Sequence, residues 1–351
     1  MIGRRSVPRF ASRLLVAFLA LCALVAGCAS TDLAGDSTAG GSPTDGSAAS
    51  VAVPAVSTAA ESGGVLTVQH QYGATVIPSR PTRVITLLGS WTDTLIALDV
   101  PITAEYVQQG FGGKYNRFAW TPEHVSEVHA VPSLQQVNVE ELAAYQPDLI
   151  LAGYVGDRAI YDKLSKLAPT IPVIATDSVM DTWQQITTTA GEIFGRQDQA
   201  RSLIDEVDAK IDRFTRDHPA IEGKTADFTQ LGLDNQIYAV VSATDPATRL
   251  LSEVGLGMSP QLRAIPANGM GRVMISNERV GDLAADLLLA WPLVGGPPAY
   301  DKVPGWAALP AVQSGAVLYL DNDNAAAFSY PSVYSVPFAL DLLAPAAAKV
   351  R

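Results

Sequence analysis

The sequence is poor in cysteine, histidine and basic residues. Its 351 residues include two cysteines, Cys22 and Cys28, and four histidines. No thiol follows Cys28, which excludes disulfides, cysteine-ligated iron–sulfur clusters and cysteine nucleophiles from the globular part of the chain. Asp and Glu number 35 against 24 Lys and Arg, a formal net charge of −11. This acidic balance disfavours nucleic acid and anionic lipid as partners.

Motifs that would identify an enzyme or a metal site are missing from the sequence as well. The glycine-rich segment 110–113 lacks the residues that complete a phosphate-binding loop, and no Gly-x-Ser-x-Gly nucleophile elbow occurs. His124 and His129 are five residues apart and would face away from each other on a helix, while His70 and His218 are isolated. We therefore expect no enzyme and no covalent cofactor or metal site, and a hydrolase or a zinc- or manganese-binding protein stays the weaker alternative.

The N-terminus has the features of a secretion signal. Four arginines form a basic region: Arg4, Arg5, Arg9 and Arg13. The apolar run that follows, 14–26, is too short to cross a bilayer comfortably. It ends in Gly27-Cys28, which resembles the bacterial lipobox, in which small residues precede a cysteine that is acylated before cleavage. We expect residues 1–27 to be removed and Cys28 to carry the lipid (palmitate) on the outer face of the bacterial plasma membrane.

Removal of this signal would leave 20 Lys and Arg against 35 Asp and Glu, a net charge of −15. Residues 28–64 are mostly Ser, Thr, Gly, Ala, Asp and Pro, a composition typical of a flexible tether. Treated as a random coil of about 35 residues, this tether would span roughly 30 Å.

From residue 65 onward, apolar strand patterns alternate with helical patterns. We expect strands at 84–88, 148–152, 236–241, 286–290 and 316–320, and helices at 93–98, 139–145, 160–168, 247–254 and 278–284. This alternation predicts an α/β fold of two Rossmann-like lobes with parallel sheets, at residues 65–180 and 218–351. The connecting segment, 181–217, contains apolar residues at helical spacing from Gln197 to Asp217, which predicts one long helix capped by Asp198.

The arrangement resembles the substrate-binding proteins of ABC importers that carry ferric siderophores, haem or cobalamin. The resemblance rests on the expected opening hairpin and strand at 72–85, on the helix-then-strand segment 137–150 with Gln146-Pro147-Asp148, and on segments 275–288 and 306–315. It implies two lobes joined by one rigid helix, with the ligand cleft between them. It also implies that Glu140 and Glu278 form salt bridges with arginines of the membrane permease, with Glu141 as the substitute if the register differs by one.

The ligand-binding residues are expected in loops that follow the carboxyl ends of the strands. The loop 106–120 is the richest in aromatic and cationic side chains, which suit a flat, anionic iron chelate or porphyrin. The candidate contacts are Trp91, Tyr106, Phe111, Tyr115, Arg117, Trp120, Tyr154, Arg158, Tyr238, Met270, Arg272, Trp291 and Tyr330. We expect a monomer that binds a ferric siderophore. Haem is the nearest alternative, with Tyr115, Tyr154 or Tyr330 as a possible iron ligand.

Overall fold

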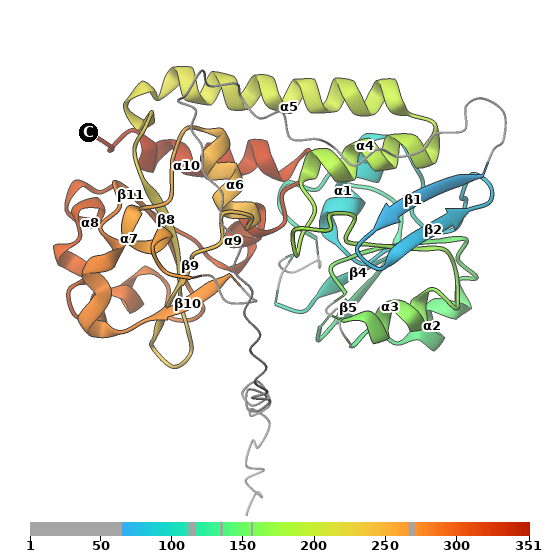
Figure 1. Ribbon diagram of the computed structural model, residues 1–351, viewed down its shortest axis with the longest axis horizontal. Coiled ribbons are helices and arrows are strands. Elements are labelled where there is room, and N and C mark those ends of the chain that lie inside the picture. Colours follow the sequence, from blue (N-terminus) through green and yellow to red (C-terminus); the bar gives the residue numbers. More distant parts are fainter. Residues whose placement is uncertain (1–64, 111, 113–116, 134–135, 156, 267–270) are drawn as a thin grey trace, which may run out of the picture. The chain divides into compact units, whose positions relative to one another are not determined.

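A computed structural model describes residues 65–351 except 111, 113–116, 134–135, 156 and 267–270 (Figure 1). These residues belong to one compact unit, Ala52–Arg351. The expected signal peptide, Cys28 and the tether lie outside the described residues. Among the residues that are described, no helix is both long and apolar enough to span a membrane.

The first lobe is built on a five-stranded parallel sheet in the order β5-β4-β3-β6-β7. Its strands are β3 (Val84–Thr86), β4 (Ala104–Gln108), β5 (Glu127–Val131), β6 (Leu149–Gly153) and β7 (Thr170–Pro172). Its helices are α1 (Gly89–Ala97), α2 (Val139–Ala144), α3 (Arg158–Leu164) and α4 (Trp183–Phe194). An antiparallel hairpin of β1 (Leu66–His70) and β2 (Gly73–Ile77) precedes the sheet, as the resemblance implied. Every residue of β6 is buried, since helices cover both faces of a parallel sheet.

The second lobe contains another five-stranded sheet, in the order β10-β9-β8-β11-β12. Its strands are β8 (Ala226–Leu231), β9 (Ile237–Val240), β10 (Arg272–Ile275), β11 (Leu287–Pro292) and β12 (Val317–Tyr319). Its α-helices are α6 (Pro246–Glu253), α7 (Pro260–Arg263), α8 (Pro310–Ser314), α9 (Asn322–Ser329) and α10 (Ser335–Ala347). The 3₁₀ helices are η3 (Pro219–Ile221), η4 (Asn277–Leu283), η5 (Pro297–Lys302) and η6 (Trp306–Ala308).

The two-lobed α/β fold is confirmed, but the expectation of a fully parallel second sheet is wrong. Strand β9 runs antiparallel to both β8 and β10, whereas β8, β11 and β12 are parallel. The connection from β8 to β9 is a short turn in which Asn235 has a φ of 58°, too short for the crossover that parallel strands need. The helix type expected at 278–284 is also wrong, because η4 is a 3₁₀ helix and not an α-helix.

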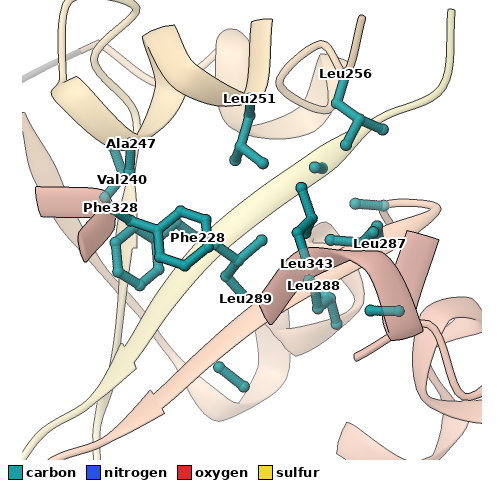
Figure 2. Close-up of a cluster of buried hydrophobic side chains, with 14 of the residues drawn as sticks. Phe228, Val240, Ala247, Leu251, Leu256, Leu287, Leu288, Leu289, Phe328 and Leu343 are labelled. Carbon is teal, nitrogen blue, oxygen red and sulfur yellow. The ribbon is translucent and has the colours of Figure 1, made fainter. Parts of the chain in front are cut away.

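The core of the second lobe joins its sheet to the helices that cover it (Figure 2). Phe228 of β8 and Leu289 of β11 face Leu251 of α6, Phe328 of α9 and Leu343 of α10, and all five side chains are buried. Full burial of one such side chain stabilises the fold by about 1.5–3 kcal/mol.

The long connecting helix, α5 (Gln197–Asp217), has the predicted bounds. Its apolar face, which includes Val207 and Phe214, is buried, and it packs against α4 of the first lobe and α10 of the second (Figure 1). At about 1.5 Å per residue the helix is roughly 30 Å long. The predicted cap was wrong: Asp198 lies in the first turn, 3.5 Å from Arg201, because Arg196 occupies the N-cap position.

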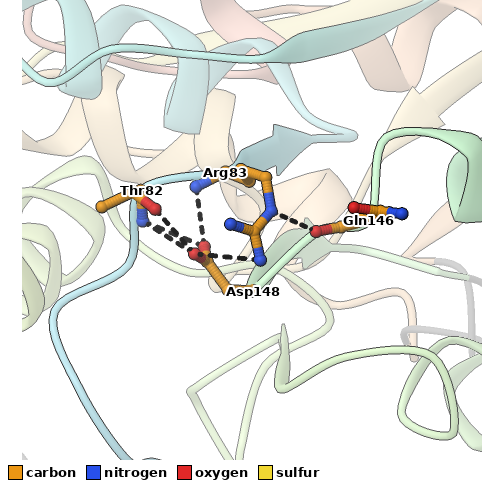
Figure 3. Close-up of polar contacts among 4 residues, drawn as sticks. All are labelled: Thr82, Arg83, Gln146 and Asp148. Atoms are coloured by element: carbon orange, nitrogen blue, oxygen red, sulfur yellow. Dashed lines mark hydrogen bonds and ion pairs between the residues drawn. The ribbon is translucent and has the colours of Figure 1, made fainter.

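One aspartate in each lobe joins the start of a central strand to the start of its neighbour, and Figure 3 shows the aspartate of the first lobe. Before β6, Asp148 accepts hydrogen bonds from the backbone N–H groups of Thr82 and Arg83, at 3.0 and 2.8 Å, just before β3. Before β11, Asp286 accepts from the backbone N–H and the hydroxyl of Thr225, both at 2.8 Å, just before β8. The aspartates in the segments that carry the family resemblance therefore align strands.

Candidate ligand-binding site

A pocket lies where β3 and β4 end, at the carboxyl edge of the first sheet. Its empty volume is about 580 Å³, open solvent at its mouth included. The residues that line it come from the ends of β3 and β4, from α1, from the loop after β4, and in one case from the second lobe: Leu87, Leu88, Gly89, Thr92, Asp93, Glu105, Tyr106, Val107, Gln108, Arg117, Phe118, Thr121 and Tyr330. This is the edge of a parallel sheet at which ligands generally bind.

A buried carboxylate, Asp93 of α1, borders the pocket. Its Oδ1 accepts a hydrogen bond from the Thr121 hydroxyl at 2.7 Å. Its Oδ2 accepts from Trp120 Nε1 at 3.0 Å and from the Ser332 hydroxyl at 2.5 Å. Burial raises the pKa of Asp93 to about 6, although these bonds act in the opposite direction. The carboxylate therefore joins α1, the loop after β4 and the second lobe.

A second buried carboxylate of the pocket, Glu105, belongs to β4. Its Oε1 accepts from His124 Nε2 at 2.8 Å and from the Ser126 hydroxyl at 2.7 Å. No sequence signal identified Asp93, Glu105 or Ser332 as site residues. Asp93 begins a segment that we interpreted only as a helix, no element was predicted at Glu105, and Ser332 is 239 positions from Asp93.

Three predicted ligand contacts border this pocket, but only two of them present side chains suited to it. Arg117 lies on the loop, 3.5 Å from Glu123, and the half-buried Tyr330 comes from the second lobe. The ring of Tyr106 stacks on His129 at a centroid distance of 4.8 Å. Consecutive strand residues point to opposite faces, so Tyr106 and Glu105 lie on different sides of the sheet.

The two predicted tryptophans of the first lobe have packing roles. Trp91 is completely buried in the core of the first lobe and does not line the pocket. Trp120 stacks on Phe118 with centroids 4.5 Å apart and packs against Phe338 of α10 at 5.2 Å. Trp120 thus connects the pocket loop to the second lobe.

In the second lobe, Arg272, the first residue of β10, lies close to Trp291, near the carboxyl end of β11. The Arg272 guanidinium is 6.0 Å from the centroid of the Trp291 ring, within the range of a cation–π contact. Trp291 Nε1 donates to Asn322 at the start of α9, at 2.8 Å. Burial raises the pKa of the Tyr330 hydroxyl, and the positive charge of Arg272 opposes this rise. Arg272, Trp291 and Tyr330 therefore stay predicted ligand contacts of the second lobe.

The remaining candidate ligand contacts lie apart from one another, on different elements. Tyr154 follows β6 and is 39% exposed, so it is available to a ligand. Arg158 lies over the ring of Tyr72 at 5.7 Å, on the hairpin side of α3, and the Tyr238 hydroxyl donates to Asp234 at 2.7 Å. Neither of these two side chains lines the pocket. Phe111, Tyr115 and Met270 lie outside the described residues.

The two predicted docking glutamates are exposed, one on each lobe. Glu140 lies in the first turn of α2, where Asn138 caps the helix by accepting its backbone N–H. The neighbouring Glu141 is engaged, since its Oε1 lies 3.0 Å from His129 Nδ1. Glu278 lies in the first turn of η4, and hydrogen bonds from its own backbone N–H and from Ser276 lower its pKa. Hence both carboxylates remain available to cationic partners.

No group of three or more histidine, cysteine, aspartate or glutamate side chains that could hold a metal ion occurs within the described part of the chain. The histidines that the sequence contains are committed to other contacts. His70 bonds to Thr75, His124 to Glu105, and His129 to Tyr145.

The two lobes, the linking helix and the pocket at the sheet edge define a two-lobed α/β binding protein. The chain belongs to the periplasmic binding protein family, whose model matches residues 84–324. Over 152 residues it is 34% identical to the ferric-anguibactin-binding protein of Vibrio anguillarum, which covers 42% of this chain and 45% of that protein. A putative ABC transporter substrate-binding lipoprotein of Bacillus subtilis is 22% identical over 274 residues, covering 73% of this chain and 80% of that protein.

Solved structures share the fold over nearly their whole length. A periplasmic solute binding protein from Mycobacterium smegmatis is 26% identical with a TM-score of 0.67, over 82% of this chain and 99% of that one. The Streptococcus pneumoniae protein PiaA in complex with ferrichrome is 24% identical with a TM-score of 0.69, over 81% and 99% of the two chains. By contrast, the match spans less than half the length of the first curated relatives.

Proposed function

We propose that this chain is the solute-binding protein of an ABC importer and that it captures a ferric siderophore for delivery to the permease. The observation that carries the proposal is the pocket at the carboxyl edge of the first sheet, which Tyr330 of the second lobe also lines. The names of relatives support the chemistry, since they include binding proteins for ferric anguibactin and ferric enterobactin. The chain acts as a carrier, not as an enzyme.

The pocket combines apolar walls with a few polar groups, a composition typical of small-molecule sites. Leu87, Leu88 and Phe118 supply apolar surface, and Arg117 supplies a cation for an anionic chelate. Tyr330 adds an aromatic ring and a hydroxyl that can bond to a chelate oxygen. Arg272 and Trp291 extend the same chemistry on the second lobe.

The test is a tryptophan-fluorescence titration of the purified protein with ferrichrome, ferric enterobactin, ferric dicitrate, haem and cobalamin. We expect at least one ferric chelate to bind, and Tyr330→Ala to weaken it about tenfold, equivalent to ~1.4 kcal/mol. Tyr145→Ala is the matched control, since Tyr145 bonds to Glu127 and His129 away from the pocket. Binding of haem with a Soret shift, without binding of any ferric chelate, would contradict the siderophore assignment.

For docking, we propose that Glu140 and Glu278 each receive an arginine of the permease. Bidentate arginine–carboxylate pairs on two lobes would fix both position and orientation. The contact between Glu141 and His129 favours Glu140 over its neighbour as the docking residue of the first lobe.

Cells that carry Glu140→Ala together with Glu278→Ala are expected to take up the chelate at least tenfold more slowly, with unchanged affinity of the purified protein. Asp198→Ala is the control, because Asp198 is an exposed acid on α5. Normal uptake by the double variant would refute the docking roles.

We also propose that the protein is exported and held at the outer face of the plasma membrane through lipidated Cys28, and that it works as a monomer. Relatives in Bacillus subtilis are described as lipoproteins. A tether raises the effective concentration of the binding protein at its permease. Loss of metabolic palmitate labelling in a Cys28→Ser variant, with chelate binding intact, is the expected result. Labelling of that variant at the wild-type level would contradict the anchor.

A further inference from the structure

The carboxylate of Asp93 receives donors from two separate parts of the chain. Trp120 and Thr121 belong to the loop that covers the pocket, and Ser332 belongs to the segment between α9 and α10 of the second lobe. Asp93 and Ser332 are 2% and 0% exposed, so water does not compete for the bond between them. A hydrogen bond to a buried charged group is stronger than one between neutral groups.

The direction of these bonds is fixed by their donors. The hydroxyl of Ser332 accepts the backbone N–H groups of Tyr334 and Ser335, at 3.2 and 2.9 Å, so its single hydrogen is directed to Asp93. The indole of Trp120 can only donate. The ionised carboxylate is therefore the shared acceptor on which the loop and the second lobe converge.

The same loop meets the second lobe at two further points. The backbone N–H of Gly112 donates to Asp323 of α9 at 2.7 Å, and the ring of Trp120 packs against Phe338 of α10. Between these contacts the loop carries Arg117, which lines the pocket. Any movement of the second lobe relative to α1 is therefore transmitted to pocket-lining side chains.

We propose that Asp93 is a positioning residue that fastens the pocket loop to the second lobe, and that chelate affinity depends on this fastening. The proposal rests on the siderophore-binding function proposed above, and it adds the element through which lobe position and ligand binding are coupled. The residue acts through Trp120, Thr121 and Ser332, and its own contact with the chelate is not required.

The pH dependence of binding provides a readout that a packing role would not give. Burial raises the pKa of Asp93 to about 6, so the carboxylate that accepts these hydrogen bonds takes up a proton as the pH falls through 6. A protonated carboxyl is a weaker acceptor for Trp120, Thr121 and Ser332, so chelate affinity would fall as the pH falls through 6. Other titratable or charged groups face Asp93 or border its pocket: Glu105 with its partner His124, Arg117, Tyr330 and Tyr334. Comparison of the wild type with Asp93→Asn isolates the Asp93 contribution.

The experiment uses Asp93→Asn, Ser332→Ala and the double variant, with Asp99→Asn as control. Asp99 follows the C-cap residue of the same helix, is exposed and has a φ of 52°, which asparagine accepts readily. Ferrichrome affinity is measured by tryptophan fluorescence between pH 5 and 7.5. We expect each single variant to bind about tenfold more weakly at pH 7.5, the double variant to be little worse than either, and the pH dependence to be lost in Asp93→Asn.

Amide hydrogen exchange of the ligand-free proteins tests the fastening itself. We expect faster exchange in residues 117–121 and 330–335 together in both single variants, with unchanged exchange in β6 as evidence of an intact fold. Unchanged exchange in these two segments, or additive losses of affinity in the double variant, would overturn the proposal. If the wild type binds no ferric chelate, the proposed function and the role of Asp93 in affinity both fail, while the exchange result still decides whether the fastening exists.

Discussion

The buried carboxyl of Asp227 allows a quantitative prediction about the pH dependence of stability. Asp227 lies on β8 and is 1% exposed. Its Oδ1 accepts the backbone N–H of Ser259 at 3.0 Å, whereas its Oδ2 has no hydrogen-bond partner among the described residues. Burial raises the pKa of this carboxyl from 3.8 to about 6. The folded state therefore holds a proton that the unfolded state releases.

The sign follows from proton linkage. Between pH 3.8 and 6 the folded state binds more protons than the unfolded state, so the free energy of unfolding falls as the pH rises. At 1.36 kcal/mol per pKa unit, the whole window amounts to about 3 kcal/mol. Roughly half of this contribution to the free energy of unfolding, ~1.5 kcal/mol, is lost between pH 5 and 7.5. The other half is already lost below pH 5, because the carboxyl of the unfolded chain is mostly ionised at that pH.

The perturbation is Asp227→Asn, which keeps the acceptor for Ser259 but removes the titration. The amide N–H groups of the asparagine lack acceptors, which costs about 1–3 kcal/mol of stability at every pH. The change of the free energy of unfolding with pH is therefore more informative than its value at one pH. Urea unfolding at pH 5 and 7.5 should show the variant gaining ~1.5 kcal/mol relative to wild type at the higher pH. Asp93 and Asp181 titrate in the same direction in both proteins and cancel in this difference. Parallel stability curves, within 0.3 kcal/mol, would refute the reasoning.

Two further predictions concern stability. Asp148→Ala removes the acceptor that aligns β3 with β6 and is expected to cost about 2 kcal/mol in urea unfolding, with Asp198→Ala, an exposed acid, as control; a loss below 0.5 kcal/mol would contradict the strand-aligning role. His70 is buried, and burial lowers its pKa from 6.5 to about 4, so its contribution is present above pH 6.5 and is lost as the pH falls through 4. The wild type should therefore lose up to ~3 kcal/mol of stability through His70 as the pH falls from 7 to 4, and His70→Gln should not show this loss. Tm is measured for both proteins between pH 7 and 4, and an equal fall of Tm in both would refute this assignment.

Local sequence patterns were sufficient for much of the fold. The apolar face of α5 repeats at helical spacing, and the continuous apolar runs of β6 and β11 indicated strands buried on both faces. The direction of β9 could not be predicted in this way, because an apolar run of four residues looks the same in either direction. The length of the turn at 232–235 carries this information, because parallel strands need a longer crossover connection.

The candidate site was less predictable, because its members meet only through the tertiary fold. Residues of the loop 106–120, Arg117 and Phe118 among them, line a pocket at the carboxyl ends of the strands, where the general rule for parallel sheets predicts a ligand. Residue type alone, however, could not distinguish Trp91, which is buried in the core, from Tyr330, which borders the pocket. Asp93 and Ser332 were missed because neither a helical aspartate nor an isolated serine has a local signal.

The joint between the lobes constrains how this protein can release its ligand. The helix α5 packs against both lobes without interruption, and Trp183, the first residue of α4, is buried in the core of the second lobe. A large rotation between the lobes would expose Trp183 and separate α5 from α4 or α10, at a cost of several kcal/mol in buried apolar surface. Asp93 and the pocket loop meet the second lobe through fewer contacts, which include two hydrogen bonds and the packing of Trp120 on Phe338, so breaking them exposes less apolar surface. Under the proposed function, ligand release would begin at Asp93 and Ser332, and a permease at the proposed docking residues Glu140 and Glu278 would need to move the lobes only slightly.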